Sequence, residues 1–535
     1  MTPPKKSFSL NSVPRPVLVG IMILGMLGAF FSQHSLNNQR GRLSPTYLEP
    51  LQDAPPMLAL TANALGGFRG IIATYLWLRA NEMQLQDRYS EQMQLSEWVS
   101  QLQPTVPMVW VNRAWNMAYN ISKTYEDPEI RWRYVYDGVK MLRDRGIKYN
   151  PQEPIIYNEL CYIFEHKIAH NLDDHHRYYK LRWMEMMQDV LWESQEEANR
   201  MEGVPDFDAL INPPNQEVAK RAERLRREFG MDPIEMKLLH ERYGRAKRMD
   251  GTVVNVLDWR FAEVQTLYWG VLGRKRCANN PSRERELRKL EKKIYISMMY
   301  LFYRGKMNLP SGRSISPGDF VSNRFYVVPN LDIAESTHRS YMDMVEVAQA
   351  SRLDHHTEGT TEIGHMNFLK RNISWLYFYN REEEALKWLE IAVELYPEKM
   401  TWGPEFDPET DTVDLEKLVR ARLEDDIQRG GDYQVQAILI GMLVKHFTYL
   451  ALGDEDNAIE YYEFIERIYA RYVERFKNSP ERMGLPPLED LRRTRLTAFL
   501  LEEDPKMVAQ LRTRMGLGPD ELPAPDSGNE EIGLA

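Results

Sequence analysis

Cysteine is scarce in this chain, with only Cys161 and Cys277 among 535 residues. Two thiols cannot build a disulfide framework or a four-thiolate zinc site, although one bridge in an oxidising compartment stays open. Positive charge is also in deficit, since 68 Lys and Arg face 78 Asp and Glu, for a net charge of -10. We therefore expect no nucleic-acid partner, because such proteins need a surface that neutralises phosphates.

Nucleotide-binding and serine-hydrolase motifs are also missing. The sequence contains no G-x-x-x-x-G-K-S/T, G-x-G-x-x-G or G-x-S-x-G, so neither activity gains support. The chain is instead 43% apolar and 27% charged, a composition typical of folded globular proteins.

One apolar run lies near the N-terminus, at residues 17–32. Its fifteen uncharged residues to Phe31 would span roughly 22 Å as a helix, which is short for a bilayer. Arg15 can snorkel and the bilayer can thin, so this length is still compatible with a span. Ala29 is followed by two phenylalanines, which does not fit the small-residue pattern of a cleavage site. We predict an uncleaved transmembrane anchor at 17–32, with a cleaved signal peptide as the alternative.

Basic residues flank this run unequally. Three precede it and two follow it: Lys5, Lys6 and Arg15, then Arg40 and Arg42. By the positive-inside rule, residues 1–16 are predicted to be cytoplasmic and the main domain to lie outside the cytoplasmic (inner) membrane.

A second apolar stretch, residues 64–78, contains three glycines and Arg69. We predict that it forms the first buried helix of the main domain. A second span or an interfacial segment is the alternative, which the central arginine makes costly.

Helical hairpins are predicted beyond a linker. Residues 33–57 contain four prolines and are typical of a linker. The segment 76–103 has apolar residues at helical spacing, a turn at 87–89 and a stop at Pro104. This pattern predicts two helices joined by a short turn.

Small residues recur at helical spacing in EEEALKWLEIAVELYP. Ala385 and Ala392 would let two helices approach closely, Leu389 would fill the space between them, and Pro397 would end the helix. These residues resemble the tetratricopeptide repeat, a helix-turn-helix module that serves as a protein-interaction scaffold. The likeness is clearest over 375–397 and 434–477 and weaker over 72–104 and 132–151.

The stretches LWLRANEMQLQDRYSEQMQLSEWVSQLQP, VWVNRAWNMAYNIS and LDWRFAEVQTLYWGVLG also resemble a group of membrane-anchored bacterial repeat proteins of undetermined activity. That resemblance implies an anchored helical array and no particular chemistry.

We predict an all-α fold: a TPR-like array of helical hairpins, or α-solenoid, with irregular insertions, preceded by one N-terminal transmembrane helix. Two runs, 252–257 and 324–328, look strand-like but are too few for a sheet. Long loops are expected at 200–270 and 305–335. The predicted parts of the main domain are N-terminal helical repeats at 58–200, an irregular helical insertion region at 201–335, C-terminal TPR-like repeats at 336–517 and a disordered acidic tail at 518–535.

A cluster of histidines and acids is the first candidate site. In a helix, His166 and His170 would lie one turn apart, a spacing that two metal-binding imidazoles can use, with Asp173, Asp174 or His175 closing the site. The order of residues is not H-E-x-x-H, so it does not indicate a peptidase. Ordinary surface residues are the simpler interpretation, and no cofactor is required.

A second cluster combines three histidines and two glutamates: His355, His356, Glu358, Glu362 and His365. Glycine and threonine interrupt the segment, so loop residues without a ligand are the favoured interpretation.

Aromatic residues are abundant, and most of them are expected to pack between helices. If a groove binds a peptide, the residues that we predict to contact the partner are Trp115, Tyr119, Trp259, Arg260 and Arg324.

The sequence thus favours a non-catalytic, membrane-anchored, extracytoplasmic scaffold for a protein or peptide partner, with its oligomeric state open. One alternative is an α/α-toroid enzyme acting on envelope carbohydrate, for which Asp258 and Glu263 are the least arbitrary acids. A metal-dependent enzyme built on the 165–176 cluster is the other.

Overall fold

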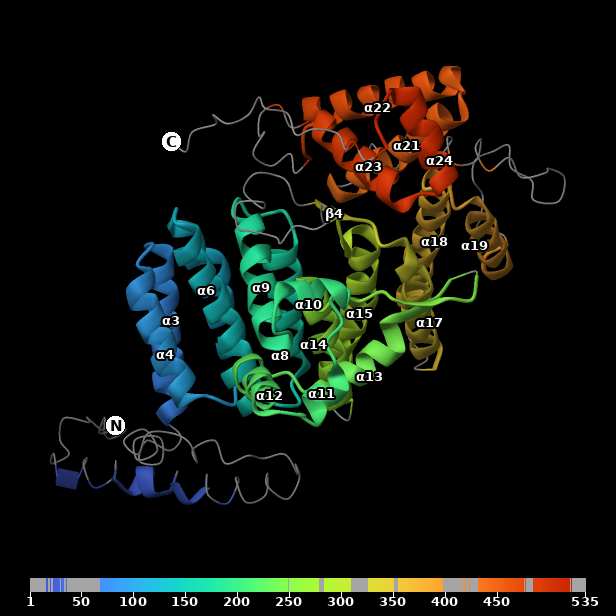
Figure 1. Ribbon diagram of the computed structural model, residues 1–535. Helices are drawn as coiled ribbons and strands as arrows, with labels where there is room; N and C mark the ends of the chain where they lie inside the picture. The colour runs from blue at the N-terminus through green and yellow to red at the C-terminus, as the bar shows by residue number, and fades with distance from the viewer. Residues whose placement is uncertain are drawn as a thin grey trace, which may run out of the picture. The chain divides into compact units, whose positions relative to one another are not determined.

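The computed structural model describes residues 68–248, 250–278, 283–308, 326–350, 355–397, 432–475 and 485–519, together with isolated residues elsewhere. Helices predominate in these ranges, which confirms the all-α class (Figure 1). Those residues of the predicted anchor that are described are helical. The linker and the acidic tail lie almost wholly outside the described residues.

Contacts along the chain divide it into two compact units. Unit 1 consists of Met1–Leu160 and Arg276–Arg283, and unit 2 consists of Cys161–Lys275 and Glu284–Ala535. The first division therefore falls at residue 160, whereas the sequence suggested one at 200.

Unit 1 begins with a helical hairpin. Helix α3 (Phe68–Leu85) and helix α4 (Tyr89–Leu102) lie side by side (Figure 1). Asp87 forms the turn between them in the left-handed region, with a φ of 56°. The predicted turn and the predicted stop before Pro104 are both confirmed.

Three π-helical turns follow in unit 1 and at the start of unit 2. Each continues an α-helix without a break, and such turns are rare overall but frequent at functional sites. The elements here are α5 (Pro107–Trp115), η2 (Asn116–Ile121), η3 (Ser122–Thr124), α6 (Pro128–Lys140), η4 (Met141–Gly146), α7 (Ile147–Tyr149), α8 (Pro154–Tyr162) and η5 (Ile163–Ala169).

Close packing of α5 against α6 depends on a glycine. A Cβ at Gly138 would lie 2.9 Å from the Ala114 carbonyl oxygen, so only glycine fits this crossing. Asp127 caps α6 by accepting hydrogen bonds from the first-turn amides, and Pro128 occupies its first position.

The segment predicted as a long loop at 200–270 is largely helical. Its helices satisfy their own backbone groups and bury apolar faces, as Asn215 at the N-cap and Gly230 at the C-terminal end of α12 illustrate. Much of the other predicted loop, 305–335, lies outside the described residues. Helices α9 (His176–Leu191) and α10 (Gln195–Arg200) precede this segment. Those that begin within it are α11 (Phe207–Ile211), α12 (Gln216–Phe229), α13 (Pro233–Tyr243) and α14 (Ala262–Cys277).

Each strand-like run pairs with a short partner that sequence pattern did not identify. Strand β2 (Val253–Asn255) pairs antiparallel with β1 (Arg245–Lys247), and β4 (Tyr326–Val328) pairs with β3 (Lys306–Asn308). These are two separate two-stranded ribbons rather than one sheet.

The rest of unit 2 is built from long helices. Phe302 on α15 is fully buried and stacks on Trp375 of α18 at a centroid distance of 5.0 Å, at the centre of this core. The elements are α15 (Glu284–Arg304), η7 (Leu331–Ile333), α17 (Ala334–Ala350), α18 (His355–Phe378), α19 (Glu382–Leu395), α21 (Asp432–Leu452), α22 (Glu455–Arg475), α23 (Leu488–Glu502) and α24 (Pro505–Met515).

The packing expected of the repeat-like segment is present in α19, which contacts α18. Ala385 and Ala392 are fully buried, and Leu389 is 4% exposed. Helices α21 and α22 form another hairpin, with Gly453 at a φ of 81° in the turn.

Within the described residues, one helix is long and apolar enough to cross a membrane. It covers Gln434–Leu452 of α21, and 78% of it is buried in the protein. It also contacts α22, α23 and α24, as a core helix does.

Candidate functional site

Two of the residues predicted to bind a partner lie together in unit 1. Trp115 ends α5 and Tyr119 follows one turn later in η2, with ring centroids 5.6 Å apart. Trp115 is 39% exposed and Tyr119 is half-buried. Such a stacked pair offers apolar area to a partner.

Trp259 and Arg260 of unit 2 are instead buried, at 0% and 3% exposure. Arg260 forms an ion pair with Asp258, Nη2 to Oδ2 at 2.7 Å, and donates to Asn199 Oδ1 at 2.5 Å. A partner at the surface cannot reach either side chain, so their role here is structural. Arg324 lies outside the described residues.

The residues proposed as metal ligands do not converge. The rings of His166 and His170 are 6.4 Å apart between centroids. Asp173 accepts a hydrogen bond from Lys167 Nζ at 2.5 Å and another from the backbone N–H of His175 at 3.0 Å. In the part of the chain that the structure describes, no group of three or more His, Cys, Asp or Glu could hold a metal ion.

The same region of unit 2 contains a buried polar cluster. Arg304 Nε donates to Glu263 Oε1 at 2.5 Å, with the two side chains 1% and 4% exposed. Lys293 pairs with Glu165 of η5 at 2.6 Å. Burial lowers the pKa of His170 to about 3, and the Arg304 charge adds to this effect. Ion pairs and the neutral His170 therefore occupy this part of unit 2.

His365 of the second predicted cluster belongs to a hydrogen-bonded chain in unit 2. Its Nε2 is 2.9 Å from His338 Nδ1, and its Nδ1 is 2.8 Å from the Tyr396 hydroxyl. His365 is fully buried, and this burial lowers its pKa to about 3. The side chains of its predicted companions His355, His356 and Glu358 lie outside the described part of the chain.

The two acids suggested for carbohydrate cleavage both form ion pairs with arginines. Asp258 is paired with Arg260, and Glu263 is paired with Arg304. Neither carboxylate is placed to act on a sugar at a cleft.

An open cavity of about 590 Å³ lies in unit 1, where the α3–α4 turn faces η3 and α6. We call it the tyrosine pocket, because three tyrosines contribute to its wall. The residues that line it are Asp87, Tyr89, Ser90, Met93, Ile121, Lys123, Thr124, Tyr125 and Tyr134.

The wall of the tyrosine pocket is held by hydrogen bonds. The rings of Tyr125 and Tyr134 stack with centroids 5.2 Å apart, and their hydroxyls are 3.2 Å from each other. This hydrogen bond, together with burial, raises the pKa of Tyr134 to about 12. Arg131, which is 9% exposed, donates from Nε to the Tyr125 carbonyl oxygen at 2.6 Å and fixes the chain there.

The lining of the tyrosine pocket contains one acid, Asp87, and one base, Lys123, and they differ in their hydrogen bonds. Asp87 accepts a hydrogen bond from the Tyr89 hydroxyl at 2.9 Å, which raises the pKa of that hydroxyl. Lys123 is exposed, and its ammonium group makes no hydrogen bond or ion pair with any residue that the structure describes. The pocket therefore combines aromatic surface with a cation that is open to a ligand.

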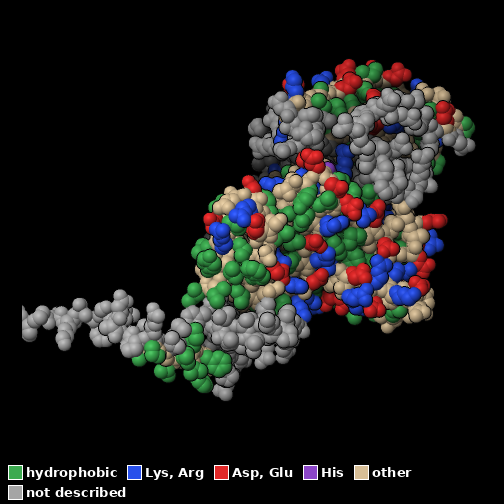
Figure 2. All heavy atoms as spheres, turned by 90° about the vertical axis from the view of Figure 1, so that its left-hand side faces the viewer, with side chains coloured by type: hydrophobic (Ala, Val, Ile, Leu, Met, Phe, Trp, Pro, Cys, Tyr) green, Lys and Arg blue, Asp and Glu red, His purple; other side chains and the backbone are tan. Residues whose placement is uncertain are grey.

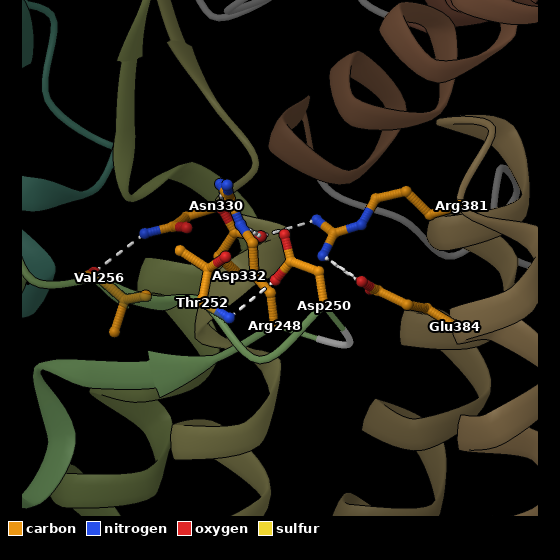
Figure 3. Close-up of polar contacts among 8 residues, drawn as sticks. All are labelled: Arg248, Asp250, Thr252, Val256, Asn330, Asp332, Arg381 and Glu384. Atoms are coloured by element: carbon orange, nitrogen blue, oxygen red, sulfur yellow. Dashed lines mark hydrogen bonds and ion pairs between the residues drawn. The ribbon is translucent and has the colours of Figure 1, made fainter.

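A separate polar network in unit 2 surrounds Asp332 (Figure 3). Its carboxylate lies 2.6 Å from Arg248 Nη2 and 2.9 Å from Arg381 Nη1. Burial opposes ionisation, but the two arginines outweigh it and lower the pKa of Asp332. Arg381 also pairs with Glu384 at 2.6 Å. These charges balance, so the network joins the β1–β2 turn to the α18–α19 turn rather than forming an ion site.

The tyrosine pocket was not found from the sequence because its residues come from three separate segments. The one usable signal is that Tyr89 and Tyr125 sit next to helix ends, beside turns. Their proximity depends on how α4 is placed against the segment between η3 and α6, which the local sequence does not encode.

Comparison of the chain with protein-family models, with curated proteins and with solved structures found no match.

Proposed function

We propose that this protein is a membrane-anchored, extracytoplasmic, TPR-like helical scaffold that binds an extended peptide segment of a protein partner in the tyrosine pocket. The single observation that carries the proposal is the pocket itself, with three tyrosine rings and Lys123, whose ammonium group pairs with none of the described residues, around one opening. No catalytic step is part of this proposal.

The lining selects the kind of peptide. Tyrosine rings give large contact areas at a low cost in side-chain entropy, and their hydroxyls offer hydrogen bonds. Aromatic grooves of this type bind proline-containing segments, whose extended conformation is already ordered before binding. Lys123 adds attraction for a carboxylate. The preferred ligand is therefore an extended segment with proline beside an acidic residue.

The volume is compatible with such a ligand. Pockets of roughly 300 to 1,000 Å³ enclose most of a small ligand, and about 590 Å³ lies within that range. A short stretch of a longer partner would fill it.

The membrane part of the proposal rests on the sequence. The apolar run at 17–32 and the surplus of Lys and Arg before it favour a single span with the N-terminus inside.

A displayed peptide library selected against detergent-solubilised full-length protein tests the proposal. The selected peptides are expected to contain proline and Asp or Glu. Tyr134→Ala should weaken their binding by roughly tenfold or more, because buried aromatic anchors contribute over about 1.4 kcal/mol. Lys123→Glu should shift the selection from acidic to basic peptides.

Trp115→Ala is the matched control, since Trp115 is an exposed aromatic residue of the same unit that does not line the pocket. If Trp115→Ala abolishes binding while Tyr134→Ala does not, the Trp115–Tyr119 pair is the binding site and the pocket is not. A library without specific binders would overturn the peptide-binding function.

A further inference from the structure

The first hairpin of unit 1 buries few large apolar side chains. Helix α4 buries Gln92, Ser96 and Ser100 together with Val99. Helix α3 buries Ala73 and Ala80, which are 1% and 5% exposed, and Met83. Small and polar side chains therefore make up most of the buried residues of this helix pair, with Val99 and Met83 as the apolar exceptions.

Large apolar side chains of the hairpin point outward instead. Ile71 is 68% exposed, Tyr75 is 66% exposed and Leu78 is 64% exposed. They recur at intervals of four and three residues, so they form one stripe on α3. Figure 2 views the molecule from the side on which α3 and α4 lie in Figure 1, and hydrophobic side chains gather on the surface there.

We call Ile71, Tyr75 and Leu78 the α3 face. At the start of α3, Gly70 lies against Gln103, which follows the end of α4, with 3.8 Å from its ideal Cβ to Nε2. The two helices therefore run antiparallel.

Charge is low at this end of the hairpin. Residues 70–78 contain no charged side chain, and Arg69 precedes them at the start of α3. Glu97 is paired with Arg113 and lies 3.6 Å from Arg145. The exposed ion pairs are at the other end, where Arg79 pairs with Glu82 and Arg88 with Glu91.

Small residues between helices with large apolar residues outside are typical of helices packed in lipid. In water the hydrophobic effect favours the opposite arrangement. Tyrosine and tryptophan prefer the boundary between headgroups and acyl chains, where a ring can be apolar at one end and hydrogen-bonded at the other.

We propose that the α3 face docks on the lipid bilayer and buries Ile71, Tyr75 and Leu78 in the interfacial layer. The proposal rests on the membrane location proposed above. The bilayer is favoured as the partner of the α3 face because only residues 33–67 separate the predicted span from α3. The apolar end of the hairpin is the end at which the chain arrives from that span.

This arrangement combines the predicted buried helix with the interfacial segment that was one of its alternatives. One side of α3 is buried against α4, and the other carries the stripe. Arg79 and Glu82 in the second half of α3 are exposed, so the helix lies on the bilayer and does not cross it.

Site-directed spin labelling of the full-length protein in phosphatidylcholine–phosphatidylglycerol vesicles tests the proposal. Cysteine is introduced as Ile71→Cys, Tyr75→Cys or Leu78→Cys, one at a time. Both native thiols are buried, and burial raises the pKa of Cys161 well above its usual value and that of Cys277 to about 12. A thiol-directed nitroxide should therefore react at the introduced site.

Collisions of the nitroxide with oxygen, which concentrates in lipid, are compared with collisions with a water-soluble nickel complex. The matched control is Ile459→Cys on α22 of unit 2, whose native side chain is 57% exposed. Labels at 71, 75 and 78 should favour oxygen several-fold more than the label at 459.

Two results would overturn the proposal. Equal nickel access at 75 and 459 would place the α3 face in water. Shielding of the 75 label from both reagents would mean that protein, such as a second copy of the chain, covers the face. Alkaline extraction of the same vesicles tests the proposed membrane anchor separately. A protein without a transmembrane anchor would be washed off the vesicles, whereas an anchored protein would stay with them. Peptide binding through Tyr134 is measured independently.

Discussion

At the scale of single residues, the stability of unit 2 should depend strongly on the buried ion pair between Arg304 and Glu263. Arg304→Met leaves the Glu263 carboxylate buried without its partner. We expect a loss of about 3–5 kcal/mol in the free energy of unfolding, measured by urea denaturation in detergent. The double variant Glu263→Gln/Arg304→Met should recover much of the loss, because apolar replacement of a buried pair is tolerated.

Lys220→Met supplies the control for this experiment. Lys220 pairs with Glu217, and these side chains are 59% and 69% exposed. Solvent screens such a pair, so the denaturation midpoint should not move. A similar loss in both single variants would show that burial does not distinguish the two pairs.

His365 should make the protein less stable in acid. Its pKa is about 3 in the folded protein, whereas an unfolded histidine has a pKa near 6.5. Below pH 6.5 the unfolded chain therefore binds a proton that the folded protein excludes. The free energy of unfolding consequently decreases as the pH is lowered. At pH 5 the contribution is a loss of about 2 kcal/mol.

His365→Gln should remove this contribution, since glutamine does not titrate. Unfolding free energies at pH 7 and pH 5 are compared for the two proteins, and the variant should lose less on acidification. An identical loss in both would mean that His365 is charged in the folded protein.

At Arg260 the residue type alone does not indicate where the side chain lies. An arginine beside a tryptophan suggested an accessible contact, but Asp258 and Asn199 satisfy its guanidinium in the core. Asn199 is 61 residues away in the sequence, and local patterns carry no information about such a partner.

At the scale of elements, the small residues of α19 should resist enlargement. Ala392 is fully buried where α19 contacts α18. Ala392→Leu would force the two helices apart and should cost about 1–3 kcal/mol, seen as a lower midpoint in urea. Leu386→Ala, at a position that is 42% exposed on the same helix, should change the midpoint little. A tolerated leucine at 392 would show that the hairpin is not closely packed there.

The helical hairpins were predictable because their signals are local. The 87–89 turn, the stop at Pro104 and the spacing of Ala385 and Ala392 each lie within one or two helical turns. Only one strand of each pair could be predicted. The partner strands, β1 (RAK) and β3 (KMN), show no alternation typical of a β-strand. The π-helical turns have no corresponding signal in sequence, because side-chain periodicity changes over a single turn only.

At the scale of the whole molecule, unit 1 is discontinuous in sequence. Residues 276–283 belong to it although residues 161–275 belong to unit 2. Within unit 1, Cys277 is fully buried, and Arg283 pairs with Glu153 at 3.1 Å. This short return segment therefore fills part of the unit 1 core.

A fragment of residues 68–160 should consequently unfold without a cooperative transition in urea, because the space occupied by Cys277 is left open. Joining residues 276–283 to the fragment through a flexible Gly/Ser linker should sharpen the transition. Circular dichroism in the far ultraviolet, which reports helix content, follows both fragments. A sharp transition for 68–160 alone would show that the return segment is dispensable.

The discontinuity of unit 1 also sets an order of events during synthesis on the ribosome. The 115 residues from 161 to 275 must be translated before the return segment emerges. At about 5–20 residues per second this is a delay of roughly 6–23 s. During that interval the nascent helices of unit 1 wait with an incomplete core, so the protein should depend on chaperones most strongly before codon 283 is read.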